Sequence, residues 1–174
     1  MPRSRHVPGD LAMWLFILAE LAVFALFFAL YGVHRARQPA LFAQGQASLR
    51  LGSALVNTWL LIAGSAAVAA SVRAFAANQL ARGARLLGWT WLSGAAFLLL
   101  KGEEFAHLFT AGVSLSSDDF WMFYLSLTVF HFLHVVLGMV IIAAVWLRAR
   151  RGAYGAADHV GVETAAAYWH MVDL

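Results

Sequence analysis

The sequence predicts an all-α integral membrane protein, a single bundle of five transmembrane helices. Of its 174 residues, 62% are hydrophobic and only 12% are charged, whereas a soluble domain has about 45–50% apolar and about 25% charged residues. The mean hydropathy is +0.73. Apolar runs of roughly the 20 residues that a membrane-spanning helix needs recur along the chain, separated by short polar loops. No linker, repeat or low-complexity segment interrupts them, so residues 1–174 form one domain.

The first two apolar runs predict helices over residues 11–33 and 51–76. The first follows Asp10, a suitable N-cap, and its lone charge is Glu20. Because this run is too long for a signal peptide and lacks a cleavage-like exit, we expect it to remain as an anchor. The second run is rich in small residues at intervals that let helices approach closely: Ala63, Ala67, Ala70 and Ala74. We therefore expect it to be a packing helix.

The later runs predict helices over residues 84–109, 119–147 and 161–174. The third and fourth are longer than the hydrocarbon thickness requires, so we expect them to be tilted or to project beyond it. The fifth has about 14 residues, which at 1.5 Å each reach only about two-thirds of the way across. Either the sequence is truncated, which we favour, or the last helix ends inside the membrane.

The arginines predict the orientation of the bundle. If the loops alternate between the two sides, the side that holds the N-terminus carries Arg3, Arg5, Arg73, Arg82, Arg85, Arg148, Arg150 and Arg151. The opposite side carries Arg35, Arg37 and Arg50. The positive-inside rule therefore puts the N-terminus in the cytoplasm. On the far side, Asp118 and Asp119 suit the N-terminus of the fourth helix, where a helix dipole favours negative charge.

Composition also excludes several function classes. The chain has no cysteine, which excludes disulfides, iron–sulfur clusters and a thiolate-bridged copper centre. The net charge of +3 and the pI near 9.8 are compatible with nucleic acid binding. However, the basic residues are spread among short loops rather than gathered into one stripe, so we expect them to set topology and not to bind nucleic acid.

Ionisable side chains inside the predicted helices are the candidate functional residues. The stretch TVFHFLHVVLG carries His131 and His134, and AAAYWHMVD carries His170 and Asp173. Such groups are costly at bilayer depth and are expected to face protein or a cavity. At 1.5 Å per residue, Glu20 and His170 lie about 10–15 Å from the cytoplasmic face, while both helix-four histidines lie near the midplane. We therefore expect Glu20 to contact His170 or a helix-four histidine, within a midplane lock that includes Asp173.

A second polar group is predicted nearer the outer face, at the end of the third helix. It contains Lys101, Glu103, Glu104 and His107, with Asn57 of the second helix at a comparable depth. We expect Lys101 to pair with Glu104 at i,i+3 spacing and Glu103 to bond Asn57.

The alternative interpretation is an autonomous membrane oxidoreductase that binds haem or a di-metal centre. Its ligands would be His131, His134 and His170, or Glu104 and His107. Two histidines three apart on one helix cannot ligate both faces of a haem, although either one with His170 is geometrically possible. The di-metal version has one Glu-x-x-His pair, whereas di-iron bundles use two pairs and two further glutamates. Interhelical hydrogen bonding is the commoner use of such histidines.

Several segments resemble subunit III of the haem-copper oxidases, in the order found in that family. They are LAELAVFALFFALY with Glu20, Asn57-Thr58, KGEEFAHLF, FHFLHVVLG and GVETAAAYWHMVD. The resemblance covers the chain from about Gly9 to its end. It is closest to the shorter, five-helix branch, and PGDLAMWLFILAEL with YWHMVDL looks most like the member that accompanies bacterial nitric oxide reductases.

The resemblance implies a non-catalytic accessory subunit that binds no haem or metal. It would stabilise a catalytic, haem-bearing subunit in the bacterial inner membrane. The active site of that partner subunit would contain copper or non-haem iron in addition to haem. The accessory subunit would also support proton uptake or bind phospholipid. The residues that match the family's polar positions are Glu20, Asn57, Glu103, Glu104, His131, His134, Glu163, His170 and Asp173. The chain departs from the family in its short fifth helix. It also lacks the first two helices of the longer form, and with them that form's lipid cleft.

Overall fold

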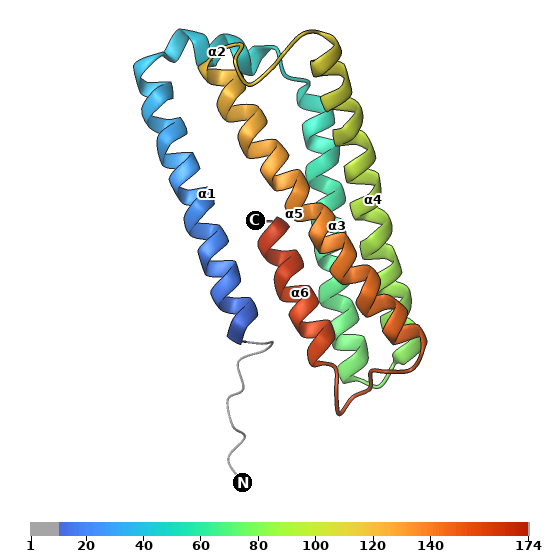
Figure 1. Ribbon diagram of the computed structural model, residues 1–174. Coiled ribbons are helices and arrows are strands. Elements are labelled where there is room, and N and C mark those ends of the chain that lie inside the picture. The colour runs from blue at the N-terminus through green and yellow to red at the C-terminus, as the bar shows by residue number, and fades with distance from the viewer. Residues whose placement is uncertain (1–10, 174) are drawn as a thin grey trace.

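The computed structural model describes residues 11–173, and these are all-helical, as predicted. The helices are α1 (Leu11–Arg37), α2 (Pro39–Ala47), α3 (Leu51–Ala76), α4 (Leu80–Thr110), α5 (Asp119–Arg150) and α6 (Val160–Asp173). Figure 1 shows the four long helices side by side, with α2 lying across one end. The predicted N-cap Asp10 lies outside the described residues, as do Arg3 and Arg5.

The number of spanning helices differs from the prediction. In the described part of the chain, α1, α3, α4 and α5 are long and apolar enough to cross a membrane. Helix α6 has 14 residues, and its C-terminal end lies partway along the bundle, between α1 and α5 (Figure 1). The short helix α2, which begins at Pro39, was not predicted. The structure therefore supports four spans and two shorter helices.

Helices α3 to α6 form a core centred on Trp169 of α6, whose side chain is fully buried. Its indole lies against glycines of the three other core helices. A methyl group added to Gly64 of α3 or Gly138 of α5 would lie 3.3 Å from the indole ring, and one added to Gly94 of α4 would lie only 2.7 Å away. Small residues let membrane helices approach closely, and here they make room for one large ring.

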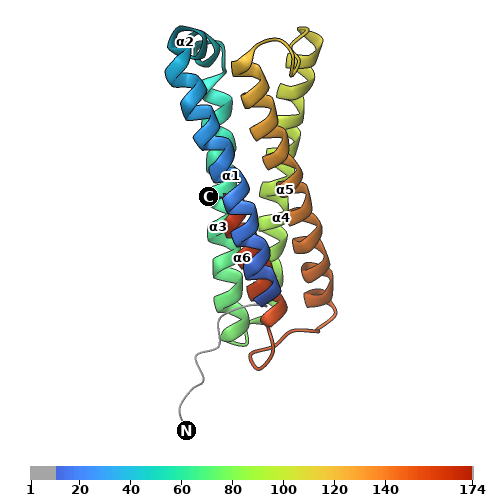
Figure 2. The ribbon, with the colours of Figure 1, turned by 60° about the vertical axis from the view of Figure 1, so that its left-hand side comes forward.

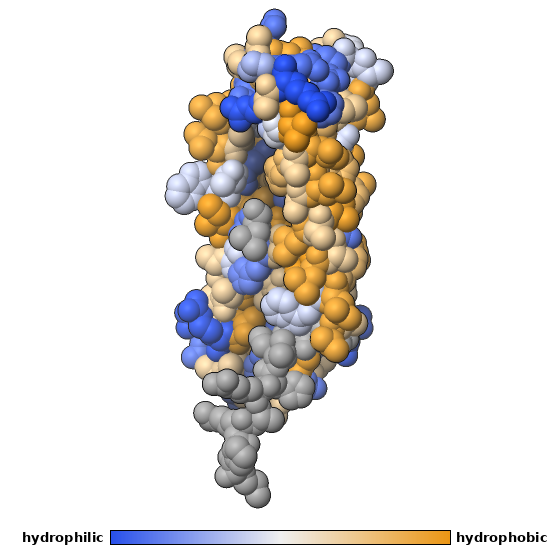
Figure 3. Space-filling model, turned by 90° about the vertical axis from the view of Figure 1, so that its left-hand side faces the viewer, coloured by the Kyte–Doolittle hydropathy of each residue, from blue (hydrophilic) through white to orange (hydrophobic). Residues whose placement is uncertain are grey.

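Helix α1 packs against this core less closely than the core helices pack against one another, with α6 beside its N-terminal half (Figures 1 and 2). Ile17 is the one buried residue of α1, whereas large apolar residues such as Leu11, Leu26 and Phe28 are more than half exposed. Figure 3 shows the resulting surface, with an apolar band between hydrophilic ends. This pattern is typical of a protein whose outer surface contacts lipid.

The arginines occupy the two ends of the bundle in the predicted grouping. The end where α1 begins carries Arg73, Arg82, Arg85, Arg148, Arg150 and Arg151, and is called the basic end below. The opposite end carries Arg35, Arg37 and Arg50. At that opposite end, Asp118 caps α5 as expected, because its carboxylate accepts a hydrogen bond from the Trp121 amide at 2.9 Å.

Candidate functional site

A cleft of about 870 Å³ opens between α1, α3 and α5, and the C-terminal end of α6 reaches into it. Most of its lining is apolar. The polar lining residues are Tyr31, Gln46, Asn57, Thr58, Tyr124, Thr128, His131, His134 and Asp173. Figure 3, which faces α1, shows hydrophilic atoms inside a furrow within the apolar band. The cleft thus brings side chains from both predicted polar groups to one space.

Glu20 of α1 and His134 of α5 meet beside the cleft, which is one of the two contacts expected for Glu20; among the described residues no hydrogen bond joins Glu20 to the other expected partner, His170. The Glu20 Oε2 and His134 Nε2 atoms lie 2.9 Å apart. His134 Nδ1 lies 2.7 Å from the backbone oxygen of Phe130, which can only accept, so Nδ1 carries a hydrogen. The contact with Glu20 therefore holds one further proton, which resides either on the carboxyl group or on the imidazole Nε2.

Aromatic rings shield this pair. The rings of Phe24 and Phe130 have their centroids 5.6 Å and 4.7 Å from that of the imidazole. His134 is only 8% exposed. Because these rings limit access of water, the hydrogen bond between α1 and α5 is stronger than it would be in solvent.

The remaining midplane residues do not form one cluster with this pair. His170 Nδ1 lies 2.6 Å from the Ser65 hydroxyl, which ties α6 to α3. The rings of His131 and Phe97 meet nearly at right angles, with centroids 5.7 Å apart, and His131 lines the cleft together with Asp173. The predicted midplane lock is thus divided into separate interhelical contacts.

The outer polar group centres on Glu104, and its expected pairing with Lys101 is confirmed. Lys101 Nζ donates to Glu104 Oε1 at 2.7 Å and to the Tyr124 hydroxyl at 3.0 Å. The Tyr124 hydroxyl in turn donates to Glu104. This triad joins α4 to α5. Sequence reasoning missed Tyr124, although a tyrosine at the depth of a carboxylate on a neighbouring helix was the available signal.

The expected hydrogen bond between Glu103 and Asn57 is wrong. Glu103 is exposed, and the buried Asn57 Oδ1 has no hydrogen-bond partner among the described residues. Consecutive helical residues lie about 100° apart, so Glu103 cannot share the face on which its neighbour Glu104 meets α5. Glu163 makes a local contact, with His159 Nε2 at 3.4 Å in the first turn of α6.

A further contact between α1 and α5 was missed at the end opposite the basic end. His34 Nδ1 lies 3.0 Å from Asp119 Oδ2, and the Gln38 amide donates to the same oxygen at 2.8 Å. The sequence predicts Asp119 as a helix-terminal charge. The contact with α1 depends on how that helix packs.

Within residues 11–173, no three His, Asp or Glu side chains lie together in a group that could hold a metal ion. Glu104 is bonded to Lys101 and Tyr124, while His107 is exposed. The proposed ligands of the oxidoreductase interpretation therefore contact other protein groups or solvent rather than one another.

Comparison with known proteins gives one consistent result. A family model described as cytochrome c oxidase subunit III matches residues 8–174. A cytochrome c oxidase subunit 3 from Synechocystis sp. is 35% identical, over 98% of this chain and 74% of the relative. A probable cytochrome c oxidase subunit 3 from Nocardia farcinica is 30% identical, over 99% and 84%. A cytochrome bo(3) ubiquinol oxidase subunit 3 from Pseudomonas aeruginosa is 29% identical, over 92% and 77%.

Proposed function

The chain belongs to the cytochrome c oxidase subunit III family, and we propose that it is a cofactor-free accessory subunit of a bacterial respiratory complex. It is a multi-pass membrane protein, and its task is to stabilise the haem-bearing catalytic subunit. The Pseudomonas relative belongs by name to a ubiquinol oxidase and the others to cytochrome c oxidases. Membership of the family is therefore compatible with different electron donors.

The observation that carries this proposal is the use of the intramembrane polar side chains. Glu20 with His134 joins α1 to α5, Glu104 with Tyr124 joins α4 to α5, and Ser65 with His170 joins α3 to α6. Each contact connects a different pair of helices. Hydrogen bonds of this kind contribute about 0.6–1.7 kcal/mol each in a bilayer, which suits a scaffold.

The autonomous oxidoreductase is not favoured, because three of its candidate ligands, His134, His170 and Glu104, are engaged in these helix-to-helix contacts. Haem, with copper or non-haem iron, is proposed instead for the partner subunit. The Glu20–His134 contact shares one proton beside the cleft. This supports the proposed additional role in proton uptake by the complex.

The finer assignments rest on the sequence. The arginine distribution supports a cytoplasmic N-terminus in the bacterial inner membrane. The similarity of PGDLAMWLFILAEL to the member that accompanies nitric oxide reductases supports that partner, while the names of the relatives support an oxygen reductase. Phospholipid is the proposed small-molecule ligand, and nucleic acid is not expected.

Co-purification tests the proposal. The tagged full chain is isolated from its native membrane in mild detergent, and the haem-bearing chain that accompanies it is identified by mass spectrometry. We expect a catalytic oxidase or nitric oxide reductase subunit at a constant ratio, and its identity decides which gas is reduced. Isolation without any haem-bearing chain would contradict the proposal.

The variant Glu20→Ala tests whether the pair is structural or catalytic. We expect the variant to pack α1 less tightly or to co-purify with less of the partner subunit. The turnover of the complex that does assemble should be preserved. Glu103→Ala is the matched control, since Glu103 is exposed and makes no hydrogen bond or ion pair among the described residues. Complete loss of turnover in a normally assembled complex would show that Glu20 takes part in the chemistry.

A further inference from the structure

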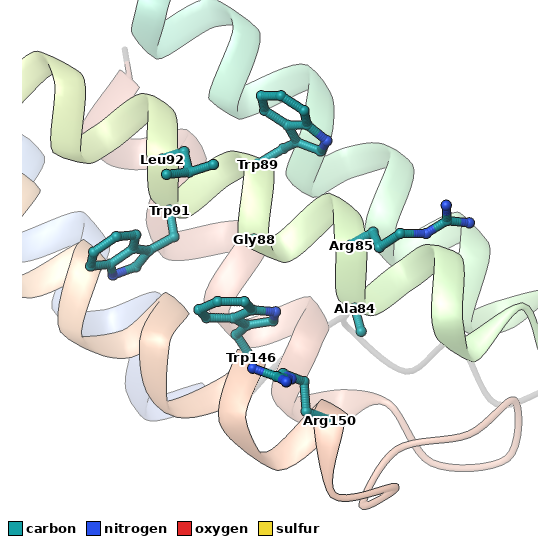
Figure 4. Close-up of a pocket in the computed structure, with 8 residues that line it drawn as sticks. All are labelled: Ala84, Arg85, Gly88, Trp89, Trp91, Leu92, Trp146 and Arg150. Atoms are coloured by element: carbon teal, nitrogen blue, oxygen red, sulfur yellow. The ribbon is translucent and has the colours of Figure 1, made fainter.

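A second hollow, of about 420 Å³, lies between α4 and α5 at the basic end. Figure 4 shows its eight lining residues, Ala84, Arg85, Gly88, Trp89, Trp91, Leu92, Trp146 and Arg150. Arg85 and Trp89 stand on one side of Gly88, and Trp146 and Arg150 stand on the other (Figure 4). The hollow therefore has a floor of small residues and two walls, each made of one arginine and one tryptophan.

The spacing of the sequence builds these walls. Arg85 and Trp89 are four residues apart on α4, and Trp146 and Arg150 are four apart on α5, so each pair shares one helix face. A methyl group on Gly88 would lie 3.3 Å from the Trp146 ring, which shows that this glycine admits the indole. Trp146 also stacks on Trp91, with centroids 6.5 Å apart and planes at 25°. The aromatic wall is thus packed in place before any ligand arrives.

The two arginines present charge that the chain does not neutralise. The Arg150 guanidinium lies 5.6 Å from the centre of the Trp146 ring, which orients it along the wall. Arg85 Nε donates to the backbone oxygen of Ala81 at 3.4 Å. Neither guanidinium makes an ion pair with another described residue. Both guanidinium groups are therefore available to pair with an anion.

The depth of the hollow identifies the class of anion. Arg85 lies near the start of α4 and Arg150 ends α5, so both lie at the level where a membrane meets water, and the tryptophans lie about a turn deeper. Tryptophan is enriched at that interface, and basic pockets between transmembrane helices bind the head groups of anionic lipids. Guanidinium groups also match phosphate oxygens geometrically.

We infer that this hollow binds an anionic phospholipid. Its phosphate lies between Arg85 and Arg150, and an acyl chain runs over Trp89 and Leu92 toward the bilayer core. The site is lined by α4 and α5 alone and shares no lining residue with the cleft beside α1.

Native mass spectrometry of the purified full chain tests this inference, with phosphatidylglycerol and cardiolipin as anionic probes and phosphatidylcholine as the zwitterionic one. The double variant Arg85→Gln/Arg150→Gln is expected to lose about tenfold or more in affinity for the anionic lipids, because each arginine near a membrane surface contributes on the order of 1 kcal/mol to the attraction. Arg35→Gln/Arg37→Gln is the matched control, since it removes the same charge at the opposite end and should retain wild-type affinity.

The conservative variant Arg85→Lys/Arg150→Lys keeps the charge but loses the fork geometry, so it should recover part of the lost affinity. Thermal melting of each variant establishes that it is folded. Three results would each overturn the inference: equal binding of anionic and zwitterionic lipids, wild-type affinity in the glutamine double variant, or an equal loss in the control at the opposite end.

Discussion

Helix α1 and the core helices α3 to α6 bury their surfaces to very different extents. Within α1, Ile17 is the one buried residue, whereas α5 alone buries ten. The core is held together by close packing, because the Trp169 indole fits against three glycines. Polar groups tie α1 to α5, through Glu20 near the middle and His34 and Gln38 near its end. In a bilayer, where lipid is as apolar as leucine, polar contacts can position a helix that packs poorly.

Removing the indole tests the core most severely. Trp169→Ala should lower the free energy of unfolding by about 3–5 kcal/mol, because it leaves a large cavity beside Gly64, Gly94 and Gly138. Unfolding in a denaturing detergent, followed by circular dichroism, measures this. Trp89→Ala removes an indole that is 65% exposed and should cost less than about 0.5 kcal/mol. Equal losses of stability in the two variants would show that the buried Trp169 contributes no more to the fold than the exposed Trp89.

Adding one methyl group to the core should have the next largest effect. Gly94→Ala places a carbon 2.7 Å from the Trp169 ring, so we expect a loss of about 1–3 kcal/mol from overpacking. Gly102→Ala, in the same helix, meets no atom within 4 Å and should be neutral or stabilising, since alanine favours helices. The same unfolding assay compares them. Stabilisation by Gly94→Ala would mean that α4 and α6 pack more loosely than described.

A double-mutant cycle measures the bond that holds α1. Glu20→Ala, His134→Ala and the combined variant should reveal a coupling energy of about 0.6–1.7 kcal/mol, the range for hydrogen bonds between helices in a bilayer. The unfolding assay supplies all four free energies. Additive effects, with no coupling, would show that the two side chains act independently.

The contact at the far end of α1 should matter least. Asp119→Asn weakens the contact with His34, and both side chains are about one-third exposed, so we expect a loss of at most about 1 kcal/mol. The loss should shrink further in high salt, because screening acts on exposed charges. Asp158→Asn, at the other end of the bundle, serves as the control. A loss comparable with that of Trp169→Ala would contradict the proposed ranking of the two regions.

The sequence could predict how deep each side chain lies in the membrane, but not how each helix is rotated about its axis. Hydropathy predicted the four long helices, because a membrane-spanning helix is recognised by its length and apolar composition alone. Depth along a helix narrowed the partner of Glu20 to His170 or a helix-four histidine, of which His134 is the one found, and local spacing was enough to pair Lys101 with Glu104. Depth failed for Glu103 and Asn57, because it does not say which side of a helix a residue occupies. The contact of Trp169 with three glycines likewise depends on the rotation of four helices.

The sequence also could not predict the short helix α2 or the contacts between distant segments. Helix α2 has nine residues, so its apolar content does not distinguish it from a loop. Hydropathy equally could not show that the apolar stretch around Trp146 lies beside Gly88 and forms a lined hollow with two arginines. Both features arise from packing between segments far apart in the chain.

Cofactor analysis of the purified chain tests the central claim most directly. If the intramembrane histidines and carboxylates join helices, as the contacts of His134, His170 and Glu104 indicate, the isolated subunit should show no Soret band and no stoichiometric iron or copper. Haem or iron at one equivalent per chain would show that these side chains are ligands, and it would contradict the account of the molecule as a cofactor-free scaffold.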